Sequence, residues 1–132
     1  MTRNDAGDGE ESPAAVDTPI DGQVIMLAAA KASVGPTHLP DLLTRVQATV
    51  GPQADDYRRD FECVYRDDDR EVYLVPTDHW AAVGDRVGFS DRETDAVRRA
   101  HDEQLLRLGS KTGRREEFET ALEIRDAVVV GV

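Results

Sequence analysis

Hydrophobic residues recur at helical spacing in the first half of the chain. In the segment 39–50 they fall at i, i+3, i+4, i+7 and i+11, and they are Leu39, Leu42, Leu43, Val46 and Val50. This spacing predicts an amphipathic helix, which Gly51-Pro52 ends. Residues 21–34 (DGQVIMLAAAKASV) predict a short helix that Asp21 can cap. That helix is apolar nearly all round, so we expect it to be buried or to form part of an interface.

The strongest strand signal follows. Two β-rich runs, 61–66 and 71–75, are joined by the acidic turn cluster DDDR. Alternation places Phe61, Cys63 and Tyr65 on one face of the first run, so Cys63 is expected to be a small buried hydrophobe. A two-stranded hairpin is marginally stable in water, and this one must therefore pack on helices or gain a further strand.

Residues 78–109 predict two helices separated by a break at Gly88-Phe89. Ser90 and Glu93 have the spacing of a capping box, in which each side chain bonds the backbone N–H of the other residue. The second helix is expected to end at Gly109, a natural C-cap. The segment GSKTG (109–113) lacks the spacing of a phosphate-binding loop, so we interpret it as a solvent loop between helices.

The segment after Gly113 is ambiguous. It predicts a helix over about residues 114–126 and a short extended end. Valines 128–130 are β-branched and also fit a strand that pairs with the hairpin, so helix and strand both stay open for residues 124–131. The pattern as a whole predicts an α+β fold: one mostly helical domain over residues 19–132 with a small antiparallel hairpin or sheet.

The distribution of charged residues adds two predictions, one about the N-terminal segment and one about the salt concentration in which the protein works. Residues 1–18 are acidic and poor in large apolar residues, which predicts a disordered tail. The chain has 27 acidic and 16 basic residues, a net charge of −11, and only two lysines. An acidic, lysine-poor composition is typical of proteins that work at high salt, where self-repulsion is screened.

Location is inferred from what the sequence does not contain. No basic start is followed by an apolar run, as a signal peptide requires. The longest apolar run, residues 24–30, is too short to cross a membrane. We therefore expect a cytoplasmic protein without membrane contact.

The only concentration of positive charge lies in residues 98–115. Its candidate contacts for an anion or an acidic partner are Arg98, Arg99, Lys111, Arg114 and Arg115. The alternative is structural, because cations also collect at helix C-termini, where the helix dipole favours them.

No catalytic, metal or cofactor motif is found. The three histidines lack zinc-ligand spacing, and Asp67-Asp68-Asp69 with Glu71 lacks the order of a calcium loop. His101 lies on the apolar face of its helix and is expected to be packed. We therefore predict no catalytic residues, no bound metal and no cofactor, and lean away from an enzyme.

Three functions remain as hypotheses. The first is a non-catalytic interaction or accessory module, which contacts a protein partner or a second copy through the apolar 24–30 helix and a surface at Tyr73, His79 and Trp80. The second is a helix-turn-helix-like DNA-binding protein that uses residues 78–109, although a net charge of −11 disfavours nucleic acid. The third is an enzyme acting on an anionic small molecule, with His79 or His101 in a pocket.

Three segments carry a family resemblance: YRRDFECVY (57–65), EVYLVPTDHW (71–80) and GRREEFETALEIRDAVVVG (113–131). Over residues 20–132 the chain resembles a family of small uncharacterised proteins of halophilic archaea. The resemblance implies a cytoplasmic single domain and supplies no activity, ligand or site residue.

Overall fold

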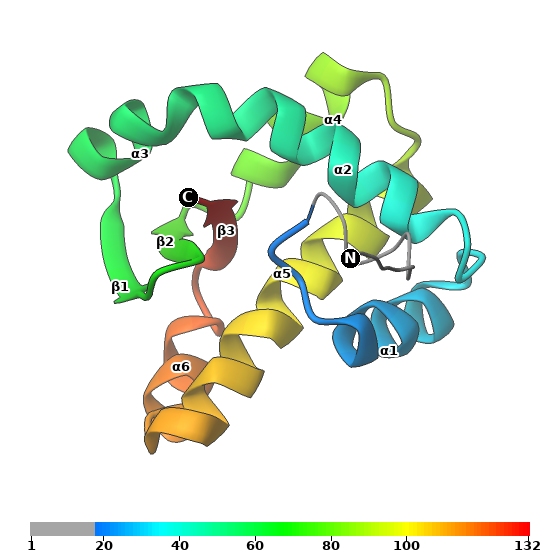
Figure 1. The fold of residues 1–132 in the computed structure, drawn as a ribbon. Helices are drawn as coiled ribbons and strands as arrows, with labels where there is room; N and C mark the ends of the chain where they lie inside the picture. The colour runs from blue at the N-terminus through cyan, green and yellow to red at the C-terminus, as the bar shows by residue number, and fades with distance from the viewer. Residues whose placement is uncertain (1–17) are drawn as a thin grey trace, which may run out of the picture.

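The structure, a computed structural model, describes residues 18–132. Apart from Thr18, the predicted disordered tail lies outside the described residues. The helices are α1 (Gly22–Ala32), α2 (Leu39–Val50), α3 (Ala54–Asp60), α4 (His79–Val87), α5 (Asp91–Thr112) and α6 (Arg115–Ala121), with a 3₁₀ turn, η2, at Gly51–Gln53. The strands are β1 (Glu62–Arg66), β2 (Arg70–Val75) and β3 (Asp126–Gly131). The predicted α+β class is confirmed (Figure 1).

The three strands form one antiparallel sheet in the order β1-β2-β3. β2 pairs with β3 from Arg70↔Gly131 to Val75↔Asp126 in a constant register. The strand alternative is thus the correct one for residues 126–131, and the helix predicted over 114–126 is too long, because α6 ends at Ala121. The three valines of β3 are fully buried, and β-branched side chains pack well on a pleated surface.

β3 lies at an edge of the sheet, but side chains from the neighbouring helices bond its free backbone groups. Its N–H donors and their side-chain acceptors are Ala127 with Asp102 (2.9 Å), Val129 with His101 (2.9 Å) and Gly131 with Gln47 (3.0 Å). Its carbonyls and their side-chain donors are Ala127 with Trp80 (3.1 Å) and Val129 with Gln47 (2.7 Å). An edge covered in this way has its buried polar groups satisfied and is closed to pairing with another chain.

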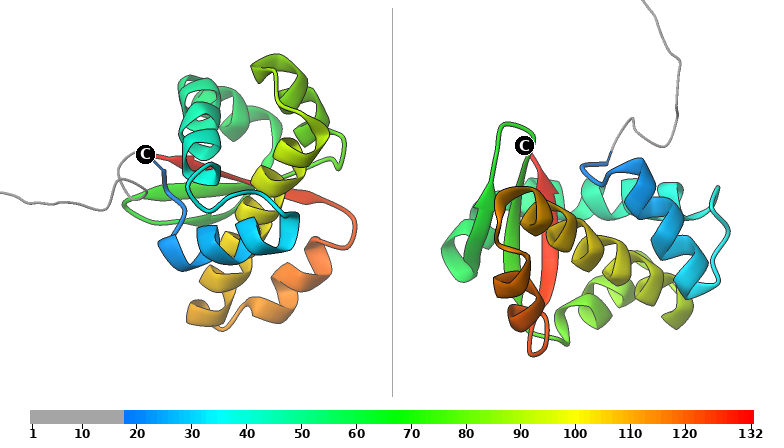
Figure 2. Two further views of the ribbon diagram at one scale, coloured as in Figure 1. Left: turned by 90° about the vertical axis from the view of Figure 1, so that its right-hand side faces the viewer. Right: turned by 90° about the horizontal axis from the view of Figure 1, so that it is seen from below.

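α5 lies between the sheet and α1 (Figure 1). One side of α5 packs on β3, and another packs on α1, which runs beside it in the right-hand view of Figure 2. The inner face of α1 is buried and consists of Val24, Ile25, Ala28 and Ala29. α1 is therefore an outer layer of the fold, with its second face turned to solvent.

Two predictions about α5 have opposite outcomes. The capping box is confirmed, because the Ser90 hydroxyl accepts from the Glu93 N–H and the Glu93 carboxylate accepts from the Ser90 N–H. The predicted end at Gly109 is wrong: α5 continues to Thr112, and Gly113, at a φ of +74°, is its C-cap. The segment 109–113 is thus the last turn of a helix and its cap rather than a solvent loop.

Gly109 is a glycine because α6 packs directly against it. A Cβ at this position would lie 2.8 Å from Cδ2 of Phe118 and 2.9 Å from the Cα of Arg115. The phenyl ring of Phe118 is fully buried in the core. Glycine therefore serves a close helix–helix approach here instead of ending the helix.

The prediction that Cys63 is buried is also wrong, because its side chain is exposed. The register between β1 and β2 shifts between Cys63 and Tyr65, where the partners change from Tyr73 to Val72. An extra residue in one strand breaks the strict alternation of faces that the prediction assumed. β1 is in addition the second edge of the sheet, and most of its residues are half-buried or exposed.

Candidate functional site

α1 presents an apolar surface to solvent. Four of its exposed residues follow the i, i+3, i+4, i+7 spacing of one helix face, namely Gln23, Met26, Leu27 and Ala30. Met26 is 63% exposed and Leu27 is 45% exposed. The only charged residue of α1 is Lys31, although one third of the whole chain is charged. We call these four residues the α1 outer face.

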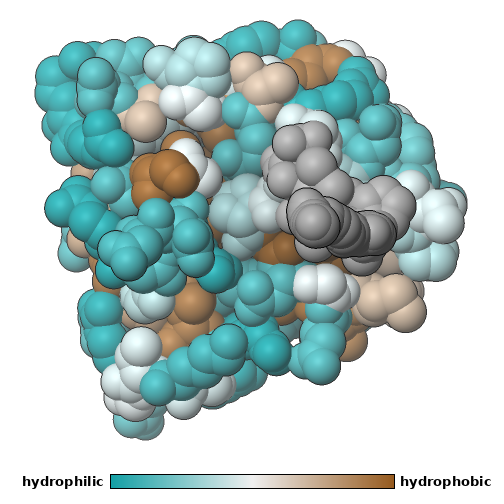
Figure 3. Space-filling view, viewed as in Figure 1, coloured by the Kyte–Doolittle hydropathy of each residue, from teal (hydrophilic) through white to brown (hydrophobic). Residues whose placement is uncertain are grey.

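Few large hydrophobic residues are exposed in the part of the chain that the structure describes. On the side drawn in Figure 3, hydrophilic residues predominate and hydrophobic residues form small separate groups. Among the described residues the exposed large hydrophobic side chains are Met26, Leu27, Ile124 and Val132. Met26 and Leu27 are neighbours on one helix, so together with Ala30 they form a continuous apolar strip rather than isolated exposed residues.

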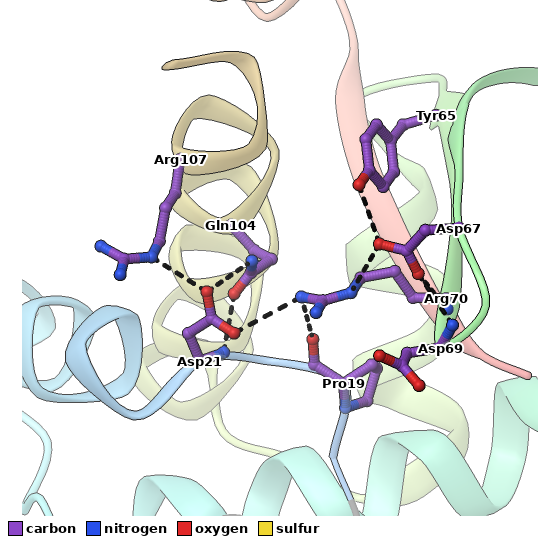
Figure 4. Close-up of polar contacts among 8 residues, drawn as sticks. All are labelled: Pro19, Asp21, Tyr65, Asp67, Asp69, Arg70, Gln104 and Arg107. Atoms are coloured by element: carbon purple, nitrogen blue, oxygen red, sulfur yellow. Dashed lines mark hydrogen bonds and ion pairs between the residues drawn. The ribbon is translucent and has the colours of Figure 1, made fainter. Parts of the chain in front are cut away.

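Asp21 holds α1 in place (Figure 4). Its Oδ2 accepts hydrogen bonds from Arg107 Nε at 2.9 Å and from Gln104 Nε2 at 3.2 Å, both on α5. Its own N–H donates to Gln104 Oε1 at 2.7 Å. Asp21 is the N-cap residue of α1, but the predicted side-chain cap is wrong, because the carboxylate bonds α5 instead of the N–H groups of α1.

The hairpin tip joins the same network through Arg70. Arg70 Nη1 donates to the carbonyl of Pro19 at 3.0 Å and lies 3.5 Å from Oδ1 of Asp21. Asp67 lies on the other side of the guanidinium, 3.6 Å from Nε, and also accepts from the Tyr65 hydroxyl at 2.8 Å. The chain entering α1 is therefore fixed to both the sheet and α5 (Figure 4).

Electrostatics keep Asp21 ionised. Partial burial opposes its charge, but the hydrogen bonds from Gln104 and Arg107 and the charges of Arg70 and Lys111 outweigh burial and lower its pKa. Because the carboxylate is the form that accepts these bonds, the network is present at neutral pH. Sequence analysis did not find this network, because Arg70 and Arg107 lie 49 and 86 residues further along the chain.

Two hollows flank this part of the molecule. One, of about 550 Å³, lies where residues 18–22, the hairpin tip and residues 131–132 meet. Its cationic wall residue, Arg70, is already bonded by the network described above. The other, of about 340 Å³, lies between α1 and α5 beside Leu27, and Val24, Arg107 and Arg115 contribute to its wall. This second hollow adjoins the α1 outer face.

Tyr73, the first residue of the predicted aromatic surface, is fully buried. Its hydroxyl donates to Glu71, whose carboxylate also pairs with Arg58 and Arg66, each at 3.0 Å. Burial and the neighbouring carboxylate raise the pKa of Tyr73 to about 12. Tyr73 therefore contributes to the core and cannot anchor a partner.

Trp80 is buried as well, with 2% of its surface exposed. Its indole N–H bonds the carbonyl of Ala127, and its ring lies 4.6 Å from the ring of His101. His79 is half-buried, and burial lowers its pKa. Its Nε2 and the Tyr57 hydroxyl form a hydrogen bond of 2.6 Å. The surface predicted at Tyr73, His79 and Trp80 is thus wrong, because two of its three side chains lie inside the protein.

His101 is packed, as the sequence predicts. Burial lowers its pKa to about 3, so the imidazole is neutral, and its Nδ1 accepts the N–H of Val129. Neither His79 nor His101 lines the two hollows described above or the hollow of about 230 Å³ between α4 and α5. The catalytic hypothesis requires one of these histidines in a pocket, and within residues 18–132 none of these three hollows provides it.

The predicted basic cluster is used in ion pairs within the chain. Arg98 pairs with Asp95 at 2.6 Å and with Asp102 at 3.1 Å, and Arg99 pairs with Asp95 at 2.8 Å. The two arginines near α6 pair along the chain, Arg114 with Glu117 (2.8 Å) and Arg115 with Glu119 (3.1 Å). Of the five predicted contacts only Lys111 has no ion pair within residues 18–132. The exposed basic stripe that the DNA-binding hypothesis requires is therefore not formed.

Two carboxyl groups that are removed from solvent lie near Arg98, Asp102 on α5 and Asp126 on β3. Burial raises the pKa of Asp102 to about 7, aided by the nearby charge of Asp126 and opposed by the N–H of Ala127 and by Arg98. Asp126, at the start of β3, also has a raised pKa because it is partly buried. The Asp102 carboxyl accepts a hydrogen bond from the Ala127 N–H at 2.9 Å. Its role is therefore to bond a free backbone group at the edge strand β3.

Residues 18–132 contain no group of three or more histidine, cysteine or acidic side chains arranged to hold a metal ion. Within the same residues no helix is both long and apolar enough to span a membrane.

Comparison with known proteins gives a family match without a function. A family model described as a domain of unknown function (DUF8048) matches residues 18–132. No curated protein and no solved structure matches the chain. The matched residues are the same ones that the structure describes.

Proposed function

The chain belongs to the family described as a domain of unknown function (DUF8048), and on that premise we propose that it is a non-catalytic protein-interaction module of a high-salt cytoplasm. Its docking surface is the α1 outer face. The observation that carries this proposal is the exposure of Met26 and Leu27 on a helix with one charge, in a chain with a net charge of −11.

The exposed side chains of Met26 and Leu27 supply the free energy for binding. Covering apolar surface stabilises a complex by roughly 25 cal/mol for each Å² removed from water. Methionine is flexible and polarisable, and it fits partner surfaces of different shape. Covering this apolar strip therefore stabilises a complex more than covering the ion-paired surface around it does.

Rigidity supports the same proposal. The network of Asp21, Gln104 and Arg107 fixes the start of α1 on α5, and the buried inner face of α1 fixes the rest of the helix. A surface that is already ordered loses little conformational entropy when a partner binds. The hydrogen bonds from α5 and from Arg70 of β2 to residues 19–21 therefore support a docking surface that is ordered before a partner binds.

Solvent conditions favour an apolar contact over an ionic one. At about 1 M salt the Debye length falls to about 3 Å, and attraction between exposed charges is largely lost. Contact between apolar side chains persists under these conditions. A protein adapted to high salt is therefore expected to recognise its partner through residues such as Met26 and Leu27.

Site-specific photo-crosslinking in cells that naturally contain the protein tests the proposal. A photo-reactive amino acid replaces Met26 in the full chain, and a matched variant carries it at Ile124, which is 73% exposed and apolar. We expect a discrete protein adduct from position 26 that is absent from position 124 and is lost when Leu27→Lys is added. Adducts of equal yield at both positions, or none at position 26, would contradict the proposal.

A further inference from the structure

We propose that the hollow between α1 and α5 binds a small amphipathic carboxylate, with the carboxylate on Arg107 and Arg115 and the carbon chain against Leu27. This ligand site goes beyond the proposed function, although Leu27 borders both the hollow and the α1 outer face. Three features support it: the mixed lining of the hollow, the N–H groups that both arginines leave unbonded, and the size of the hollow.

The lining of the hollow combines apolar and cationic side chains. α1 contributes Val24 and Leu27, α5 contributes Arg107, and α6 contributes Arg115. Glu103 also lines the hollow, but its carboxylate is already paired with the lysine of α1 at 2.8 Å. Ligand sites in proteins combine an apolar wall with a few polar groups that fix the orientation of the ligand. A carbon chain that ends in a carboxylate matches both parts of this lining.

The turn between α5 and α6 brings the two arginines to one place. Arg115 lies in α6, but its guanidinium returns to α5, where Nη1 donates to the Ser110 hydroxyl at 2.9 Å. Ser110 also lines the hollow and follows Arg107 by about one helical turn on α5. The close approach of α6 to Gly109 allows this return. Cations from two different helices therefore border the same hollow.

Both arginines keep N–H groups that have no acceptor among the described residues. Nε of Arg107 pairs with Asp21 at 2.9 Å, and Figure 4 shows its two terminal nitrogens turned away from that carboxylate. Nε of Arg115 pairs with Glu119 at 3.1 Å, and its Nη2 has no partner within residues 18–132. A guanidinium presents five N–H groups in a planar fork that suits the two oxygens of a carboxylate. Ion pairs within the chain thus hold these arginines without using all of their donors.

The size of the hollow limits the ligand. Its volume is about 340 Å³. At roughly 30 Å³ for each non-hydrogen atom, the share of one molecule in liquid water, it holds about ten such atoms. Octanoate has about this size. Because the hollow opens to solvent, we expect weak binding, with a Kd of about 1 mM.

The charge of the whole chain makes the sign of the ligand informative. A chain of net charge −11 attracts cations and repels anions at long range. Octanoate and octylammonium carry the same carbon chain and opposite charges. A preference for octanoate therefore requires cations at the site itself, which Arg107 and Arg115 supply.

An NMR titration of the full chain in about 1 M KCl, where the long-range repulsion is screened, tests the site. Octanoate should shift the backbone amide signals of Gln23, Leu27 and Ser110 in a saturable way. Octylammonium should not, and acetate, which lacks the carbon chain, should bind about tenfold more weakly or less. Equal responses to octanoate and octylammonium overturn the proposal, as does the lack of a saturable response to octanoate well above the expected Kd.

Substitution of Arg115 tests the recognition of the carboxylate. Arg115→Gln should weaken octanoate binding about tenfold, since a hydrogen bond between charged groups is lost. Arg59→Gln is the matched control, because Arg59 also pairs with acidic residues of its own helix and lies outside the hollow. It should leave octanoate binding unchanged. Unchanged binding in Arg115→Gln, or an equal loss in both variants, would contradict the site.

Leu27→Ala tests the apolar wall without relying on an ion-paired residue. Leu27 is 45% exposed, so shortening it leaves the core intact. Octanoate binding should weaken several-fold while acetate binding stays the same, because only octanoate has a chain to cover Leu27. Octanoate binding that is insensitive to this change overturns the proposal. The photo-crosslink from position 26 does not require octanoate, so either proposal can fail while the other stands.

Discussion

The backbone N–H of Val129 in β3 donates to Nδ1 of His101 in α5 at 2.9 Å. Both residues are fully buried, so neither group has access to water. The bond requires a neutral imidazole with its proton on Nε2, and burial favours that state by lowering the pKa of His101 to about 3. The one histidine on an apolar helix face is thus a backbone acceptor for the edge of a sheet.

Removing this acceptor should destabilise the protein. His101→Leu keeps an apolar side chain of moderate size but leaves the N–H of Val129 without a partner, which costs about 1–3 kcal/mol of unfolding free energy. His38→Leu is the control, because His38 is exposed and pairs with Glu93 at the surface. Urea denaturation should show the loss in the first variant, with a change of about 0.5 kcal/mol or less in the second. Equal effects would contradict a structural role for His101.

His101 and Asp102 should change the free energy of unfolding in opposite directions as the pH changes. The pKa of His101 falls from 6.5 to about 3 on folding, so its contribution is complete above pH 6.5 and is lost as the pH falls towards 3. The pKa of Asp102 rises from 3.8 to about 7, so its contribution is complete below pH 3.8 and is lost as the pH rises through 7. Between pH 4 and 6.5 the two effects largely cancel.

Asp102→Asn removes one side of this balance and keeps an oxygen acceptor for Ala127. Its unfolding free energy should fall by about 1.4 kcal/mol for each pH unit below 6.5, because Asp102 no longer offsets the histidine effect. The wild-type protein should change far less over the same range. Chemical denaturation at closely spaced pH values gives both curves, and parallel curves for the two proteins would refute the assigned pKa shifts.

Alanine substitutions at Gly109 and Gly51 should have opposite effects on stability, because a neighbouring helix packs against Gly109 and Gly51 faces open space. Gly109→Ala places a methyl group against the Arg115 backbone and the Phe118 ring, both closer than 3 Å, and should cost about 1–3 kcal/mol. Gly51→Ala enters open space at a helical φ of −54° and should be neutral or stabilising by up to about 1 kcal/mol. Thermal denaturation compares the two. A stable Gly109→Ala protein would mean that α6 does not pack on this turn.

These residues also show why parts of the fold could be predicted from sequence. The period of Leu39, Leu42 and Val46 gives α2 its bounds, because a helix with one buried face is specified by local spacing. The capping box of Ser90 and Glu93 is equally local. The end of α5 could not be found in this way, since Gly109 serves a contact with α6 that only the folded chain reveals.

The candidate site was predictable only in part. The apolar character of residues 24–30 indicates burial or an interface, and the structure shows that α1 has one buried face and one exposed face. The aromatic surface failed because a strand buried on both faces carries Tyr73 inward, which alternation alone does not reveal. The role of Asp21 was missed because its partners come from distant segments.

The network around Asp21 should control the order of α1. Asp21→Asn removes the negative charge that Arg70 and Arg107 share, and amide hydrogen exchange in α1 should become several-fold faster. Asp68→Asn, at the exposed hairpin tip, is the charge-matched control and should leave exchange unchanged. Because folding lowers the pKa of Asp21, its contribution is present above pH 3.8 and is lost as the pH falls below that value. Unaltered exchange in Asp21→Asn would show that the inner face alone holds α1.

The central claim is that the α1 outer face is covered by another protein chain in the cell. Hydroxyl-radical footprinting measures this on the unaltered protein, because Met26 oxidises readily and is 63% exposed in the single chain. Oxidation of Met26 should be several-fold slower in intact cells than in a dilute purified sample, while Ile124 reacts equally in both. If the ratio of the oxidation rate in cells to that in the purified sample is the same for Met26 and Ile124, α1 faces solvent in the cell. That result would contradict a covered α1 outer face.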